Sequence, residues 1–100
     1  MVVIWTERSK VDLRNFLHNI REGTSKSATH YISNLTKYVD SLEDNPFLGK
    51  PYSKLISINL RQLVYRKHKI LYTISGNQIF ILSVLHTSRD SDTFFQNFSA

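Results

Sequence analysis

The hydrophobic pattern changes its period near residue 50, and this change constrains the fold more than any other feature. Between Leu13 and Leu42, apolar residues recur at the three- and four-residue spacing of helices. From residue 55 onward, the runs LISINLRQLVY, KHKILYTIS and QIFILSVLH are rich in Ile, Val, Leu and Tyr and mostly too short for helices. The sequence therefore predicts helices first and a sheet second.

Two helices are predicted before the change of period. The first begins near Ser9 and ends at Gly23, and the second is capped by Ser25 or Ser27 and stops before Asn45-Pro46. The second has a continuous apolar stripe, which consists of Ala28, Tyr31, Ile32, Leu35, Tyr38, Val39 and Leu42. The residues expected in the core include Trp5, Leu13, Leu17, Tyr31 and Leu35.

Four strands are predicted around these helices. VVIW at residues 2–5 is a short β-branched run, and Gly76-Asn77 is a strong hairpin signal between the last two runs. The fold class is α+β, with a two-helix hairpin packed on one face of a mostly antiparallel four-stranded sheet, in the order β-α-α-β-β-β. We expect a single domain over residues 1–100 and a weak terminal helix at 92–98.

Strand alternation separates the two faces of the predicted sheet. His68, Ile70, Tyr72 and Ile74 share one face. Because two helices cover one face only, the other is expected to stay free. The basic residues expected to project from the free face are Arg61, Lys67 and Lys69.

The positive charge is concentrated in the second half of the chain. The net charge is +5, yet residues 1–49 hold six basic and six acidic side chains. Residues 50–100 hold seven basic side chains against Asp90 and Asp92. Such a surface attracts nucleic acid or an acidic protein segment, and the alternative is a solvated basic face without a partner.

Several classes of protein are disfavoured by what the sequence lacks. It contains no cysteine, which excludes disulfide scaffolds, thiolate metal sites and cysteine nucleophiles. No apolar run approaches the roughly 18 residues of a membrane span, and the N-terminus does not resemble a secretory signal. We therefore expect a cytoplasmic protein that does not associate with membranes.

Motifs of known chemistry are mostly missing as well. The sequence has no phosphate-binding Gly-rich loop, no G-x-S-x-G elbow and no histidine pair at ligand spacing. His68 and His86 belong to separate strands without a carboxylate cluster, so we expect neither a metal nor a cofactor. The remaining Arg, Lys and His side chains suit RNA cleavage, and they suit docking equally well.

Three segments together resemble the RelE/ParE toxin superfamily. They are NPFLGKP after the second helix, LRQLVYRKHKILYTI as a basic sheet edge, and ILSVLHTSRD at the last strand. The similarity runs from VVIWTERSKVDL through HTSRD. It implies the toxin of a type II toxin–antitoxin pair, with a cognate antitoxin as its partner.

The superfamily contains two activities, and the tail of the sequence favours one of them. RelE-type members are ribosome-dependent ribonucleases that act on mRNA, and the resemblance puts Arg61, Lys69 and His86 in comparable catalytic places. However, no tyrosine follows Tyr72, and a phenyl ring such as that of Phe95 transfers no proton. ParE-type members poison DNA gyrase, and the stretch HTSRD is similar to the end of their last strand.

The expected function is therefore that of a ParE-like toxin that poisons DNA gyrase without an enzymatic reaction. The alternative is a RelE-like endoribonuclease, and a nucleic-acid binding module ranks third, because no recognition helix rich in Arg and Asn is present. The residues expected to bind the target are Arg61, Lys67, Lys69, His86 and Arg89.

Overall fold

A five-stranded sheet in the order β1-β5-β4-β3-β2 carries the fold. The computed structural model describes residues 1–19, 25–52 and 60–93. The strands are β1 (Val2–Trp5), β2 (Lys50–Pro51), β3 (Leu60–Tyr65), β4 (His68–Ser75) and β5 (Gln78–His86). The helices are α1 (Glu7–Asn19), α2 (Ser25–Asp40) and the short 3-10 helix η1 (Ser41–Glu43). β1 runs parallel to β5, and the other pairs are antiparallel.

The predicted α+β class and the mostly antiparallel sheet are confirmed, but the sheet has one strand more than expected. The extra strand is β2, in which Lys50 pairs with Gln62 and Pro51 pairs with Arg61. Proline is tolerated there because β2 is an edge strand that needs no second row of hydrogen bonds.

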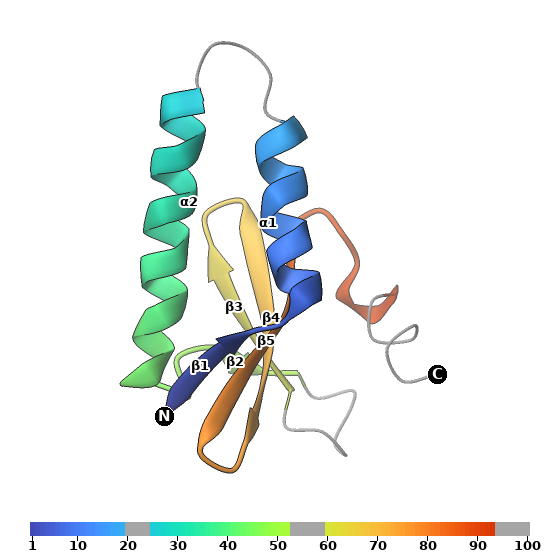
Figure 1. Ribbon diagram of the computed structural model, residues 1–100. Helices are drawn as coiled ribbons and strands as arrows, with labels where there is room; N and C mark the ends of the chain where they lie inside the picture. Colours follow the sequence, from blue (N-terminus) through green and yellow to red (C-terminus); the bar gives the residue numbers. More distant parts are fainter. Residues whose placement is uncertain (20–24, 53–59, 94–100) are drawn as a thin grey trace.

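The two helices form an antiparallel hairpin, and the turn between β3 and β4 reaches the space between them (Figure 1). Their apolar sides bury one face of the sheet, as predicted. The central buried cluster consists of Leu35, Val39, Leu42, Leu63, Ile70, Tyr72, Ile79, Ile81 and Val84. Among the described residues, no helix is both long and apolar enough to cross a membrane.

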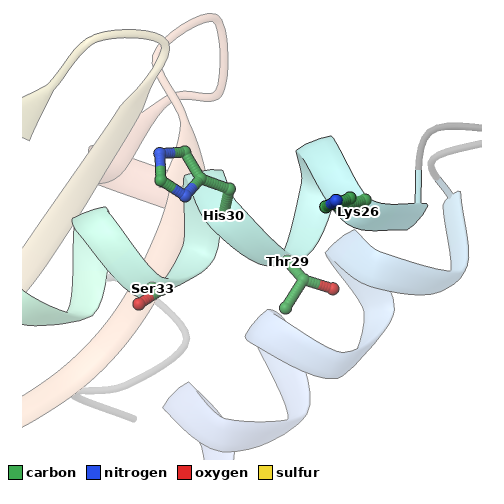
Figure 2. A pocket seen from close by; sticks show the side chains of 4 residues that line it. All are labelled: Lys26, Thr29, His30 and Ser33. Atoms are coloured by element: carbon green, nitrogen blue, oxygen red, sulfur yellow. The ribbon is translucent and has the colours of Figure 1, made fainter.

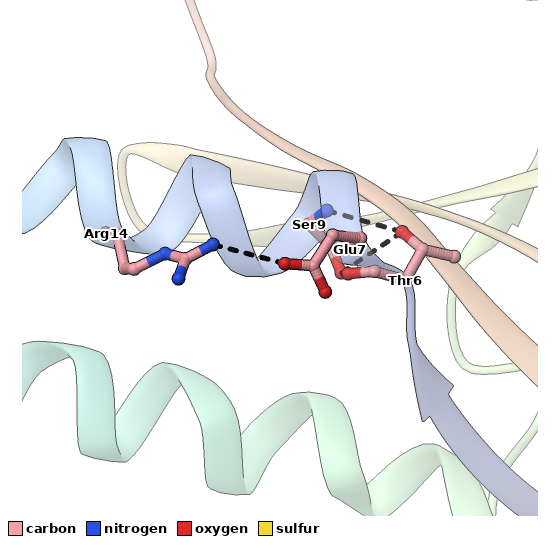
Figure 3. Close-up of polar contacts among 4 residues, drawn as sticks. All are labelled: Thr6, Glu7, Ser9 and Arg14. Atoms are coloured by element: carbon pink, nitrogen blue, oxygen red, sulfur yellow. Dashed lines mark hydrogen bonds and ion pairs between the residues drawn. The ribbon is translucent and has the colours of Figure 1, made fainter.

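Helix α1 begins at Glu7, two residues before the predicted start, because Thr6 caps it. The Ser9 amide donates to the Thr6 hydroxyl over 3.3 Å, and the Ser9 hydroxyl donates to the Thr6 carbonyl over 2.7 Å (Figure 3). The Thr6 hydroxyl also donates to the carbonyl of Ile81 on β5 over 2.6 Å. The cap therefore fixes the start of α1 to the middle of the sheet.

A β-bulge in β5 fastens α1 to the sheet a second time. The register shifts because Leu71 pairs with Ser83 while Tyr72 pairs with Ile81. The carboxylate of Asp12 on α1 accepts hydrogen bonds there from the Ser83 hydroxyl at 2.6 Å and from the Val84 amide at 3.0 Å. These two hydrogen bonds join α1 to β5 next to the bulge.

The second face of the sheet is partly covered, which contradicts the prediction that it stays free. Leu60, Leu71 and Leu82 form a separate buried cluster there. The chain that follows β5 returns over this face, since the Ser91 hydroxyl donates to the side chain of Gln62 over 2.8 Å. Alternation along β4 is correct, but the covering segment carries no periodic pattern that would have revealed it.

Most of the predicted core residues are confirmed, with one exception. Leu35 is buried, while Trp5, Leu13 and Tyr31 are partly buried against the central cluster. Leu17 is 40% exposed and does not belong to the core. It is one helical position beyond Phe16, and the helix turns it outward.

The helix ends match the prediction only in part. Helix α2 ends at Asp40 and passes into η1, earlier than the predicted stop at Asn45-Pro46. The predicted end of the first helix at Gly23 lies outside the described residues. Only the start of the predicted terminal helix is described: residues 91–93 are helical, and Asp90 caps them by accepting from the Asp92 amide over 2.9 Å.

Candidate functional site

Four aromatic side chains gather at the end of the sheet where β3 turns into β4 and where β5 stops. His68 pairs with Tyr65 on one side and with His86 on the other, so three strands meet here. Helix α1 adds Phe16, whose ring centroid lies 4.4 Å from that of His68, edge to face. Helix α2 adds Tyr31, whose hydroxyl lies 2.9 Å from Nδ1 of His68. We call Phe16, Tyr31, His68 and His86 the histidine cluster.

Burial sets the protonation of the inner part of the histidine cluster. His68 is only 7% exposed. This burial lowers its pKa from 6.5, and the charge of His86 lowers it further. Burial also raises the pKa of Tyr31 above its usual value. Near neutral pH, His68 is therefore an uncharged ring, and Tyr31 keeps its phenolic proton.

His86 differs from His68 because it is exposed. Its Nδ1 accepts a hydrogen bond from the Ser88 amide over 3.1 Å and lies 2.8 Å from the Ser88 hydroxyl. Because Nδ1 accepts, the proton of the neutral ring sits on Nε2. His86 is therefore the exposed imidazole of the cluster, and the Ser88 amide holds its ring in place.

A groove of about 490 Å³ opens beside the histidine cluster, between α1 and the end of β5. Its polar walls contain Arg8, Asp12 and Asn15 from α1 and His86 and Arg89 from the strand end. Asp12 is engaged with Ser83 and Val84, as described above. The groove is therefore lined by two guanidinium groups and by the imidazoles of His68 and His86, of which only that of His86 is exposed. This combination suits a ligand with negative charge.

The structure brings only some of the predicted target-binding residues together. His86 and Arg89 line the groove, and Lys67 is exposed in the adjacent β3–β4 turn. Lys69 is only 8% exposed, and its ammonium group donates to the carbonyl of Arg89. Lys69 thus serves to hold the segment after β5 and is not available on a free face.

Arg61 lies far from the groove, which corrects the expected basic face. It pairs with Tyr72, four residues along β4 from His68, which corresponds to roughly 13 Å at about 3.3 Å per residue. Its guanidinium donates to the carbonyls of Gly49 at 3.0 Å and Phe47 at 3.2 Å. It also lies over the Phe47 ring, 5.1 Å from the centroid. Arg61 therefore orders the loop before β2.

The polar and aromatic residues of this site that were missed from sequence are Arg8, Asp12, Asn15, Phe16 and Tyr31. A partial signal exists for two of them, because Asp12 and Phe16 are four residues apart and share one side of a helix. A stronger signal was available for His68, since alternation places it on the core face, where a polar ring needs a partner. Within the described residues, no three His, Asp or Glu side chains are placed to hold a metal ion.

Comparison with known proteins gives a consistent family and fold. A family model described as "ParE toxin of type II toxin-antitoxin system, parDE" matches residues 3–91. The chromosomal ParDE toxin–antitoxin system from P. aeruginosa contains a similar structure, with a TM-score of 0.73 and 21% identity, covering 86% of this chain and 95% of that one. No protein with a curated description is detectably similar in sequence.

Two further solved structures share the fold. One is in the toxin–antitoxin complex RelBE2 from Mycobacterium tuberculosis, with a TM-score of 0.62, 19% identity and coverage of 85% of this chain and 95% of that chain. The other is the isolated RelE toxin from E. coli, with a TM-score of 0.60, 13% identity and coverage of 98% and 95%. At these identities the structures establish the fold.

Proposed function

Because the chain belongs to the ParE toxin family of type II toxin–antitoxin systems, we propose that it inhibits growth by poisoning DNA gyrase. A cognate antitoxin neutralises it in this proposal, as expected for a type II pair. The action takes place in the cytoplasm, and residues 1–100 act as one domain.

The observation that carries the proposal is that the three candidate catalytic residues do not converge. A nuclease needs a proton-transferring group and a cation that stabilises phosphate, both within contact distance of one reacting centre. Here Arg61 is bonded to two backbone carbonyls roughly 13 Å along the sheet from the histidine pair. Lys69 is buried against the carbonyl of Arg89. His86 is left without these partners.

The sequence beyond the described residues adds no further imidazole or phenol as a proton-transferring group. Residues 20–24, 53–59 and 94–100 contain neither histidine nor tyrosine. Aromatic side chains near the C-terminus are phenylalanines, which stack but do not exchange protons. These facts favour a toxin that acts by binding its target.

The surface proposed for gyrase is the groove beside the histidine cluster together with the β3–β4 turn. Arg89, His86 and Lys67 are all exposed in this region. The cations Arg89 and Lys67, which flank a concave surface, would steer an acidic partner and set the orientation in which it docks. Arg61 and Lys69 support this surface by ordering loops and do not contact the target.

A second candidate function is ribosome-dependent cleavage of mRNA, and one observation favours it. Arg8, His86 and Arg89 line the same groove, so an imidazole and two guanidinium groups do face a common space. A phosphodiester held by the two arginines would lie near a group that transfers protons. This set differs from the one that family resemblance suggests.

Induction of the protein in a bacterial host separates the two candidates. Gyrase poisoning should trigger DNA damage signalling and loss of plasmid supercoiling, while existing messages keep their 5′ ends. Ribonuclease action should produce new 5′ ends within codons in minutes and leave DNA intact. Codon-centred cleavage that disappears in His86→Ala would replace our proposal by the second candidate.

A further inference from the structure

The turn between β3 and β4 places an arginine where a glycine is preferred. Arg66 and Lys67 are the two loop residues of this hairpin, and Arg66 has φ of 51°. Two-residue hairpin turns need positive φ at their first position, which favours Gly, Asn or Asp. The opposite hairpin follows this rule, because its first loop residue is Gly76 with φ of 59°. Arg66 therefore carries backbone strain that Gly76 does not.

A groove of about 540 Å³ lies between this strained turn and α2. Three basic side chains line it, namely Lys26 and His30 from α2 and Arg66 from the turn. Lys26 and His30 are four residues apart and so lie on the same side of the helix. They also border a second hollow that includes Thr29 and Ser33 (Figure 2). In the described part of the chain, no carboxylate is among the residues that line the groove.

We propose that this groove binds an acidic peptide segment of a partner protein. The charge of the groove, supplied by two separate elements, matches a row of Asp or Glu side chains. Ser27 and Asn34 add polar groups that can donate hydrogen bonds to carboxylates. The identification of this partner as the cognate antitoxin rests on the proposed function. The affinity of the groove for acidic peptides is argued from its own residues and does not depend on that function.

The aromatic residues of the groove favour a peptide over nucleic acid. Single-stranded RNA and DNA are held by bases that stack on open aromatic faces. Here Tyr65 is in contact with three groups: the guanidinium of Arg66 at 5.9 Å, and the rings of Tyr31 at 5.6 Å and Tyr38 at 5.5 Å. Stacking on Tyr65 would require this packing to open, but binding of carboxylates would not.

NMR titration of the purified protein with a hexaglutamate peptide at low ionic strength tests the proposal. We expect shifts of the amide signals of Lys26, His30 and Arg66. Arg66→Gly and Lys26→Gln should each weaken binding by about three- to tenfold, since each removes one cation from a partly enclosed site. Lys37→Gln removes the same charge from an exposed position of α2 outside the groove and should bind like the wild type.

Thermal unfolding distinguishes a binding role of Arg66 from a structural one. Arg66→Gly should unfold at the same temperature or a few degrees higher than the wild type, because glycine relieves the positive φ. Weaker peptide binding in a protein of undiminished stability supports the proposal. Unchanged binding of the peptide by both Arg66→Gly and Lys26→Gln would overturn it.

A uridine hexanucleotide titrated in parallel tests whether the groove binds single-stranded nucleic acid instead of an acidic peptide. The proposal is wrong if the two substitutions weaken binding of the nucleotide and leave that of the peptide unchanged. The result is also separable from the proposed function. A protein that binds the peptide through Arg66 but leaves gyrase active refutes gyrase poisoning alone. If the protein blocks gyrase while Arg66→Gly and Lys26→Gln both bind the peptide normally, only the proposal of peptide binding in the groove is refuted.

Discussion

The rings of His68 and His86 lie edge to face with their centroids 5.6 Å apart, in paired positions of β4 and β5. The two rings share one environment but differ in exposure. His68 is enclosed by Phe16 and Tyr31, whereas His86 faces solvent. Since burial and a charge on His86 both oppose a charge on His68, protonation of His68 is coupled to the stability of this end of the sheet.

The fold should become less stable as the pH falls below about 6.5. Burial, and secondly the charge of His86, lower the pKa of His68 from 6.5 in the folded protein. Above pH 6.5 the His68 ring is neutral in both the folded and the unfolded protein, and its full contribution to the free energy of unfolding is present. Between 6.5 and the lower folded pKa, the unfolded chain takes up the proton first, so the free energy of unfolding falls. Urea denaturation at a series of pH values measures this slope.

Two variants control that experiment. His68→Gln should flatten the dependence on pH in this window, while His30→Gln, which replaces an exposed histidine of α2, should leave it unchanged. An NMR titration of the His68 ring gives its midpoint directly. A midpoint at or above 6.5, or an equal slope in His68→Gln, would show that His68 is not the group responsible.

Replacing Asp12 by alanine should destabilise the protein by about 2–3 kcal/mol. The substitution removes a charged acceptor and leaves the Val84 amide at the β-bulge without its partner. Asp44→Ala, at an exposed position after η1, is the matched control and should change stability by less than about 0.5 kcal/mol. Equal effects of the two changes would mean that α1 is not fastened to β5 through Asp12.

The two described glycines should respond to alanine in different degrees. A Cβ at Gly49 would lie 2.7 Å from the Tyr72 ring and 2.9 Å from the carbonyl of Gln62, so Gly49→Ala should cost about 1–3 kcal/mol. A Cβ at Gly76 meets nothing within 4 Å, and only its positive φ opposes alanine, at about 1 kcal/mol. Thermal unfolding of both variants gives the order, and a larger loss for Gly76→Ala would contradict the packing at Gly49.

Periodicity alone was enough to predict the class of fold. The helical stripe of α2 and the Gly76-Asn77 hairpin depend on local rules of spacing and φ, which a sequence displays directly. Strand β2 was missed because two residues, one of them proline, have no period. Its pairing with β3 is a long-range event.

The positions of the cations were harder to predict than the fold. Arg61 was expected on the same face as Lys69 because both have odd residue numbers, as if alternation ran on through the two strands. Alternation assigns faces only within one strand, and the two residues belong to β3 and β4. Pairing places Arg61 opposite Tyr72, which lies on the helix-covered face. The burial of Lys69 depends on the carbonyl of Arg89, a contact between segments 20 residues apart. Long-range contacts of this kind leave no local trace.

The role of His86 can be read from the size of its effect. If His86 only helps to dock the target, His86→Ala should reduce affinity by roughly ten- to thirtyfold, equivalent to about 1.4–2 kcal/mol. If it transfers a proton, the substitution should lower a cleavage rate by about 10²- to 10⁴-fold and leave ribosome binding intact. Toxicity is measured at a series of expression levels for the wild type and for His86→Ala, with the amount of each protein quantified. The size of the loss then shows whether His86 docks the target or transfers a proton.

Supercoiling of relaxed plasmid by purified DNA gyrase, with increasing amounts of the purified protein, tests the central claim most directly. Our account predicts that supercoiling stops and linear DNA accumulates, and that His86→Ala acts in the same way at roughly ten- to thirtyfold higher concentration. The account is contradicted if gyrase supercoils the plasmid at its normal rate while the same preparation cuts mRNA on translating ribosomes.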